Sequence, residues 1–149
     1  MDTKLKGDIA EQMVILKSLK KGWGVSVPIG DRLPYDLILD VEDKLLKIQV
    51  KSAWFDASKK NFVVDKRRTK TNRRKLVRDS YKESDFDFAI LVIEKLEVYY
   101  IMPVEVFISY GSEIHLVESN KRQRKPKSWQ FREAWNLILQ RAASEEILG

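Results

Sequence analysis

The chain has 149 residues, of which 44% are hydrophobic and 34% charged, a balance typical of one globular domain. The net charge of +6 favours an anionic partner such as nucleic acid or a membrane surface. The absence of cysteine excludes a disulfide framework and a thiolate metal site, and no apolar run approaches the roughly 20 residues of a membrane span. We therefore expect one soluble, cytoplasmic domain over residues 1–149.

The first predicted element is a helix over residues 5–21, because apolar residues recur at spacings of three and four. The apolar stripe that we expect to face the core consists of Leu5, Ile9, Met13 and Leu16. Gly22 ends the helix, and a short strand over residues 24–28 follows it. Glu11 lies to the side of the stripe and is expected to be half-buried. Taken alone, it is best interpreted as an ordinary surface acid.

Residues 34–52 carry the pattern of an antiparallel hairpin, with two runs of alternating apolar and polar residues around a charged break. With the turn centred on Glu42–Asp43, Asp36 lies directly opposite Gln49, and Lys51 falls on the same face. The other face collects apolar residues for a core: Leu37, Leu39, Leu46, Ile48 and Val50. One face of the hairpin therefore gathers a carboxylate, an amide and an ammonium group.

Two basic runs follow the hairpin, the first within an insertion at about residues 56–80. Such runs are commonly solvated surface, but a solubility surface mixes both signs of charge, whereas Asp65 is the only acid between Lys59 and Arg78. We therefore expect these runs to contact nucleic acid, mostly through phosphates. The candidate residues are Lys59, Lys60, Arg67, Arg68, Lys70, Arg73, Arg74, Lys75, Arg78, Lys121, Arg122 and Arg124.

The second half of the chain adds strands and a final helix. Residues 87–93 are almost continuously apolar, which indicates a strand buried on both faces. After it we predict a partner strand over residues 97–103, a short helix over 104–108 and an edge strand over 114–117. The last predicted element is a helix over residues 129–143, with Ser128 as its N-cap. Its apolar stripe serves core packing or a subunit interface: Phe131, Trp135, Ile138, Leu139 and Ala142.

The three polar residues of the hairpin resemble the PD-(D/E)XK nuclease signature. In that chemistry Asp36 binds a hard divalent cation that polarises the scissile phosphate, and Lys51 orients the attacking water or offsets charge on the phosphorane. The spacing alone is more often that of a surface ion pair between Asp36 and Lys51. Gln49 departs from the signature, which has an acid at that position. Its side-chain amide keeps one oxygen that can bind a metal ion but lacks the negative charge of a carboxylate.

Other stretches extend this resemblance over residues 7–107. Gly7 with Ala10–Glu11 resembles the start of resolvase-type members of the superfamily, in which a helix carboxylate joins the metal site. The two later strands and the short helix resemble the same families. Taken together, the chain resembles the PD-(D/E)XK-class homing endonucleases that group I introns encode within cyanobacterial initiator tRNA genes. That homing branch carries glutamine at the position of Gln49.

The resemblance implies an α/β fold with a PD-(D/E)XK (restriction-endonuclease-like) core, in which helices flank a mixed sheet. It implies an enzyme dependent on Mg²⁺ or Mn²⁺ that breaks both strands of DNA at an intronless tRNA gene and so initiates intron transfer. The implied catalytic residues are Glu11, Asp36, Gln49 and Lys51. The implied metal ligands are Asp36, Glu11 and the backbone carbonyl of Val50. A homo-oligomer, expected to be a tetramer, is also implied, with the last helix as the candidate assembly surface and no membrane contact.

Two other functions fit the same residues. A Holliday-junction resolvase would share the fold and the metal site but would recognise the shape of branched DNA. A catalytically inactive DNA-binding module would keep the basic runs, and Gln49 would then mark a decayed site.

Overall fold

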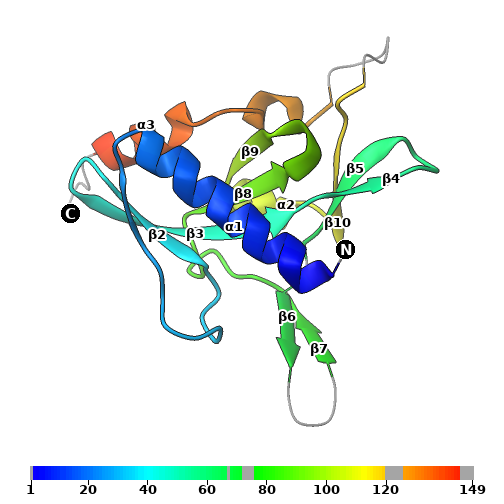
Figure 1. Cartoon of the computed structure of the whole chain (residues 1–149), viewed down its shortest axis with the longest axis horizontal. Coiled ribbons are helices and arrows are strands. Elements are labelled where there is room, and N and C mark those ends of the chain that lie inside the picture. The colour runs from blue at the N-terminus through cyan, green and yellow to red at the C-terminus, as the bar shows by residue number, and fades with distance from the viewer. Residues whose placement is uncertain (1, 67, 72–75, 120–125, 145–149) are drawn as a thin grey trace.

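The computed structural model describes residues 2–66, 68–71, 76–119 and 126–144. Its centre is a five-stranded sheet in the order β1-β2-β3-β8-β9, in which only β3 and β8 are parallel neighbours. These strands are β1 (Gly24–Ser26), β2 (Leu37–Val41), β3 (Lys44–Ser52), β8 (Phe88–Ile93) and β9 (Val98–Pro103). Figure 1 shows helix α1 (Thr3–Lys20) lying across one face of this sheet. The predicted fold class, a mixed sheet flanked by helices, is confirmed.

The β2–β3 hairpin has the predicted register. Leu37 pairs with Ile48 and Val41 with Lys44, so the turn is centred between Glu42 and Asp43. Both turn residues adopt a left-handed backbone, with φ of 50° and 64°. This is the conformation of a two-residue turn whose twist matches that of the strands. The predicted apolar face is buried at all five of its positions, Leu37, Leu39, Leu46, Ile48 and Val50.

Helix α1 forms where it was predicted, but the predicted core stripe is only partly right: Met13 packs against the core, and Leu5 and Leu16 do not. The buried side chains of the helix are Ala10, Val14 and Ser18, whereas Leu5 and Leu16 are 48% and 55% exposed. The helix is apolar on two opposite sides. The side with small residues faces the sheet, because small side chains allow the helix backbone to approach the strands closely.

Strand β8 separates two hydrophobic clusters, as expected for a strand buried on both faces. Its residues Ile90 and Val92 pack under α1 and under helix α3 (Asn136–Ala143). Its residues Ala89 and Leu91 pack on the opposite side, against helix α2 (Val104–Ser109) and strands β5 (Asn61–Asp65) and β10 (Glu113–Leu116). Both faces of the central sheet are therefore covered.

The predicted continuous helix over residues 129–143 is interrupted. A 3₁₀ turn (Trp129–Phe131) precedes α3, and the chain between them pairs with the edge of β9. The Glu133 amide donates to the Tyr99 carbonyl (2.7 Å), and the Tyr99 amide donates to the Glu133 carboxylate (2.9 Å). Glu133 has a φ of 52°, which no helix accommodates. Ser128 directly precedes the 3₁₀ turn, but its side chain makes no capping hydrogen bond there, and its hydroxyl donates to the His115 carbonyl instead (3.3 Å).

The connection between β3 and β8 forms separate β structure. Its strands β4 (Trp54–Asp56) and β5 (Asn61–Asp65) form a small sheet with β10 (Glu113–Leu116), which comes later in the chain, in the order β10-β5-β4. Strands β6 (Arg68–Thr71) and β7 (Leu76–Asp79) pair as a hairpin that extends away from the central sheet (Figure 1). The remaining 3₁₀ turn, Glu94–Leu96, joins β8 to β9. Within the described ranges, no helix combines the length and apolar character needed to cross a membrane.

Two neighbouring leucines test the hairpin register. Leu46 is 5% exposed and Leu45 is 68% exposed, and a one-residue slip would exchange their environments. We expect Leu46→Ala to lower the free energy of unfolding by about 2–5 kcal/mol and Leu45→Ala by less than about 0.5 kcal/mol, measured by urea denaturation. Equal losses in the two variants would contradict this register.

Candidate active site

Asp36 lies directly before β2 and is held by the neighbouring strand. Its amide donates to the Ile48 carbonyl (2.8 Å), and its Oδ2 accepts a hydrogen bond from the Val50 amide (2.8 Å). Burial raises the pKa of the Asp36 carboxyl above its usual range, although the Val50 amide and the Lys51 charge act in the opposite direction. The hairpin thus holds the Asp36 carboxyl partly buried, where a nearby positive charge would stabilise its ionised form.

Glu11 reaches the same place from α1. Glu11 and Asp36 both line a cavity of about 200 Å³ beneath the loop that joins β1 to β2. The pKa of Glu11 is raised to about 7, first by burial and then by the negative charges of Asp36 and Asp8. The prediction that Glu11 is half-buried is confirmed. Two partly buried carboxylates, one of which raises the pKa of the other, form a site that a cation would stabilise.

Gln49 and the Val50 carbonyl add neutral oxygens near these carboxylates. Gln49 is 8% exposed, and its Nε2 donates to the Val50 carbonyl oxygen (3.2 Å). A carbonyl oxygen has two lone pairs, so this bond occupies one of them. No cluster of three His, Cys, Asp or Glu side chains occurs among the described residues. The donors that fit a metal ion here are therefore two carboxylates complemented by carbonyl oxygens, which suit a hard cation of the Mg²⁺ or Mn²⁺ type.

Lys51 lies at the same end of the hairpin, and Asp65 and Tyr81 lie near its ammonium group. Burial lowers the pKa of its ammonium, while the charges of Asp65 and Asp36 act to raise it. The Lys51 Nζ lies 5.2 Å from the centre of the Tyr81 ring. That ring is itself held edge-on by Phe86, at a centroid distance of 5.3 Å. The structure therefore brings Glu11, Asp36 and Lys51 together with Asp65 and Tyr81.

Asp65 and Tyr81 were not predicted to lie near Lys51. Asp65 had a visible signal, since it is the lone acid in a long basic run, and its place at the end of β5 puts its charge near Lys51. Tyr81 had no signal of its own. It follows the β6–β7 hairpin, and only the tertiary fold returns it to the end of β3.

Comparison with known proteins decides the family. The model of the PD-(D/E)XK endonuclease family matches residues 1–138. The chain belongs to this family. It is also similar to a solved structure described as a bacterial homing endonuclease, I-Ssp6803I, at 62% identity and a TM-score of 0.90, over 96% of this chain and 97% of that one. No curated protein sequence matches the chain. Nucleases of the PD-(D/E)XK class generally use divalent metal ions, in agreement with the oxygen donors of this site.

The predicted DNA-binding residues of this PD-(D/E)XK endonuclease fall into separate places. Lys59 and Lys60 are exposed at the turn between β4 and β5. Arg68, Lys70 and Arg78 lie on the β6–β7 hairpin, which extends in a different direction in Figure 1. The other candidates lie outside the described residues: Arg67, Arg73, Arg74, Lys75, Lys121, Arg122 and Arg124.

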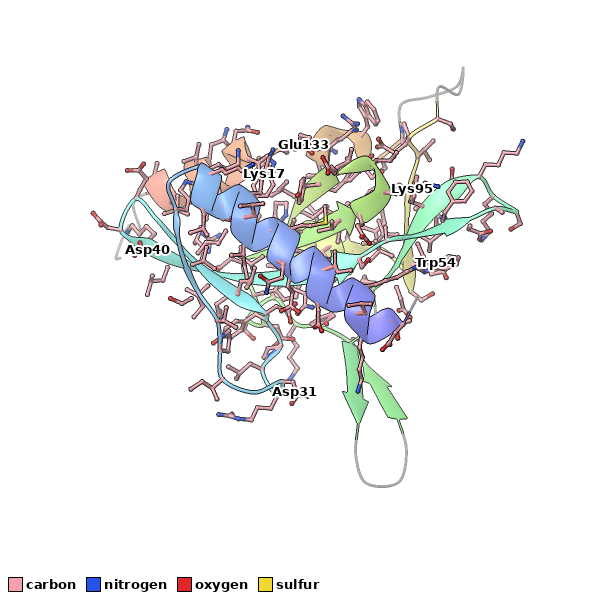
Figure 2. All side chains as sticks on the ribbon, viewed as in Figure 1. Lys17, Asp31, Asp40, Trp54, Lys95 and Glu133 are labelled. Carbon is pink, nitrogen blue, oxygen red and sulfur yellow. The ribbon has the colours of Figure 1, made fainter. Side chains whose placement is uncertain are left out.

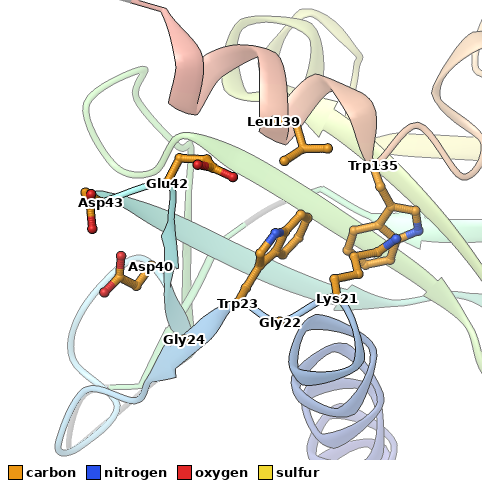
Figure 3. A pocket seen from close by; sticks show the side chains of 9 residues that line it. All are labelled: Lys21, Gly22, Trp23, Gly24, Asp40, Glu42, Asp43, Trp135 and Leu139. Carbon is orange, nitrogen blue, oxygen red and sulfur yellow. The ribbon is translucent and has the colours of Figure 1, made fainter.

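A larger cavity, of about 650 Å³, lies at the other end of the β2–β3 hairpin (Figure 3). It is bordered by the carboxylates of the turn and by the Trp23 and Trp135 rings. The Lys21 Nζ lies 4.9 Å from the Trp135 ring centre, so the chain's own cation already covers this aromatic surface. None of the catalytic residues that the resemblance implied lines it. Two of those residues, Glu11 and Asp36, line the smaller cavity instead, which is therefore the candidate site.

The two carboxylates test this assignment. We expect Glu11→Gln and Asp36→Asn each to weaken Mn²⁺ binding by at least the roughly 10- to 100-fold that loss of an outer-shell partner costs. The matched control is Asp43→Asn, an exposed carboxylate at the far end of the same hairpin. Isothermal titration calorimetry of the three variants would contradict the assignment if Asp43→Asn had an equal effect.

Proposed function

We propose that this endonuclease makes a sequence-specific double-strand break in DNA at an intronless tRNA gene and so initiates intron transfer. The observation that carries the proposal is the similarity to a bacterial homing endonuclease over almost the full length of both chains. The tRNA-gene target is inferred from the resemblance of Gln49 and its flanking strands to the homing endonucleases encoded within cyanobacterial initiator tRNA genes. Action on a chromosomal gene would place the protein in the cytoplasm.

Each residue of the site has a separate task in the proposed reaction. Mg²⁺, or Mn²⁺ in its place, bound by Glu11, Asp36 and the Val50 carbonyl, would polarise the scissile phosphate and lower the pKa of the attacking water. Asp36 also holds the Val50 amide, which keeps the two strands of the hairpin in place at the site. Gln49 orients the Val50 carbonyl through its side-chain amide. Lys51 places a positive charge beside the phosphate, where negative charge develops in the transition state.

The experiment that tests the function uses two duplexes that differ only in the intron. With Mg²⁺ we expect a discrete double-strand cut in the intronless tRNA gene and none in the gene that carries the intron, because the insertion divides the target. Lys51→Ala should lower the cleavage rate by roughly 100-fold or more while binding to the target persists. Lys44→Ala, an exposed lysine of the same strand, is the matched control.

The two alternative functions give different results in the same assay. A Holliday-junction resolvase would cut a four-way junction in preference to the linear duplex. An inactive DNA-binding module would bind the duplex but show no cleavage even as the wild-type protein. Retention of full cleavage by Lys51→Ala would contradict the role proposed for this lysine.

A homo-oligomer belongs to the proposal, because each chain has one site and two strands must be cut. The outer side of α1 supports a chain-to-chain contact, since its residues recur at alternating spacings of four and three, the repeat of a helix–helix seam. These residues are Leu5, Ile9, Gln12, Leu16 and Leu19. Figure 1 shows α1 on the outside of the molecule. Two helices paired in this way would give a dimer, and two dimers the proposed tetramer.

This surface replaces the last helix as the candidate for assembly. Most of the predicted stripe is buried in the protein's own core, with Trp135, Ile138 and Ala142 at 6%, 0% and 3% exposure, and only Leu139, at 43%, is exposed. On α1, by contrast, Leu16 and Leu19 are 55% and 54% exposed, and an apolar groove follows the seam. An exposed apolar strip of this kind is typical of a protein contact.

A charge on this surface should separate the chains. We expect Leu16→Glu to sediment as a smaller species than the wild-type protein, because the substitution buries an unpaired carboxylate in the proposed contact. Leu96→Glu, at a 46% exposed position on a different element, should assemble normally. Analytical ultracentrifugation measures the size of the species that each variant forms. Normal assembly of Leu16→Glu would exclude α1 as the contact.

A further inference from the structure

The loop over residues 27–33, which joins β1 to β2, lies beside the active site and carries one acid and one base. Part of this loop lines the cavity that Glu11 and Asp36 share. Figure 1 shows the loop extending from the sheet on the same side as the β6–β7 hairpin, and Figure 2 marks Asp31 in it. DNA with its scissile phosphate at this cavity would therefore pass along the loop.

The loop exposes apolar side chains. Ile29 is 95% exposed, more than any other large hydrophobic residue in the described part of the chain, and Val27 is 60% exposed. Single exposed hydrophobic residues are common on protein surfaces. Two of them in a short loop beside a catalytic cavity form a distinct feature, because their location coincides with the path of the substrate.

The backbone of the loop is restricted. Pro28 and Pro34 bracket its outer part, and proline fixes its own φ and limits the residue before it to extended conformations. Gly30 has a φ of 84°, a left-handed conformation that allows the chain to reverse there. A loop held in this way presents Ile29 to a ligand with little further loss of conformational entropy.

We propose that the 27–33 loop enters a groove of the DNA target and that Ile29, supported by Val27, contacts bases. An apolar side chain has no hydrogen bond or charge to offer a phosphate. It can contact the methyl group of thymine in the major groove or insert between base steps in the minor groove. Both contacts depend on sequence, whereas contacts of lysine and arginine with phosphates position the DNA without reading it.

This inference rests on the proposed function and adds to it a source of sequence preference. The basic runs account for attraction to DNA of any sequence. The loop contributes no net charge, so its contacts would distinguish one duplex from another without changing how the affinity depends on salt. Ile29 is thus assigned to specificity, and the catalytic group remains Glu11, Asp36 and Lys51.

The experiment selects preferred duplexes from a random-sequence pool with the wild-type protein, Ile29→Ala and Leu96→Ala. We expect the Ile29→Ala consensus to lose its preference at one or two adjacent base pairs and to keep the others. Its affinity for the wild-type consensus should fall about tenfold, with an unchanged salt slope. The thermal midpoint should not change, because the Ile29 side chain packs against little. Leu96→Ala should select the wild-type consensus.

A second measurement distinguishes the two kinds of base contact. Deoxyuridine in place of thymidine at the affected positions removes only the methyl group. An equal loss of wild-type affinity would indicate a methyl contact, and no loss would indicate insertion between bases. An Ile29→Ala consensus identical to that of the wild type would overturn the inference alone. A wild-type protein that selects no consensus would overturn the proposed sequence-specific function, and the inference with it.

Discussion

The hydrogen bond from the Val50 amide to the Asp36 carboxylate depends on one register of the β2–β3 pair. Side chains alternate between the two faces of a strand, so a slip of one residue would turn Gln49 and Lys51 towards the opposite face of the sheet. The left-handed backbones of Glu42 and Asp43 oppose this register by about 1–3 kcal/mol each. Burial of each large apolar side chain on the opposite face favours it by roughly 1.5–3 kcal/mol. Five such side chains outweigh two strained turn residues, so the hydrophobic face holds the site in place.

Local periodicity was sufficient to predict the hairpin, its register and the alignment of its polar residues, because alternation along a strand is a short-range property. The extent of α1 was predictable for the same reason, but not the side that faces the core. That choice depends on how closely Ala10 can approach the sheet. The break before α3 was not predictable, because it results from the pairing of Glu133 with Tyr99, which lies 34 residues away. Asp65 likewise joins the site only when β5 packs beside β3.

Burial works against the charges of Asp36, Glu11 and Lys51. It raises the pKa of Asp36 and of Glu11 and lowers the pKa of Lys51, so each charged form is less well solvated than it would be in water. A cation between the carboxylates and a phosphate beside the ammonium would offset these losses. The site therefore gains more from its ligands than an exposed group of the same residues would. Preorganised charges of this kind also need little rearrangement as the reaction proceeds.

The β2–β3 hairpin is local in sequence, and the rest of the site is not. Asp36 and Val50 are 14 residues apart, so their contact can form as soon as the hairpin closes. The contact of Lys47 with Asp87, which anchors the start of β8 beside β3, spans 40 residues, and Glu11 arrives only when α1 docks. A chain that has formed the hairpin alone holds Asp36 without Glu11 or the aromatic support of Lys51. The candidate site is therefore complete only in a chain whose long-range contacts have all formed, although half of its geometry is encoded in one short hairpin.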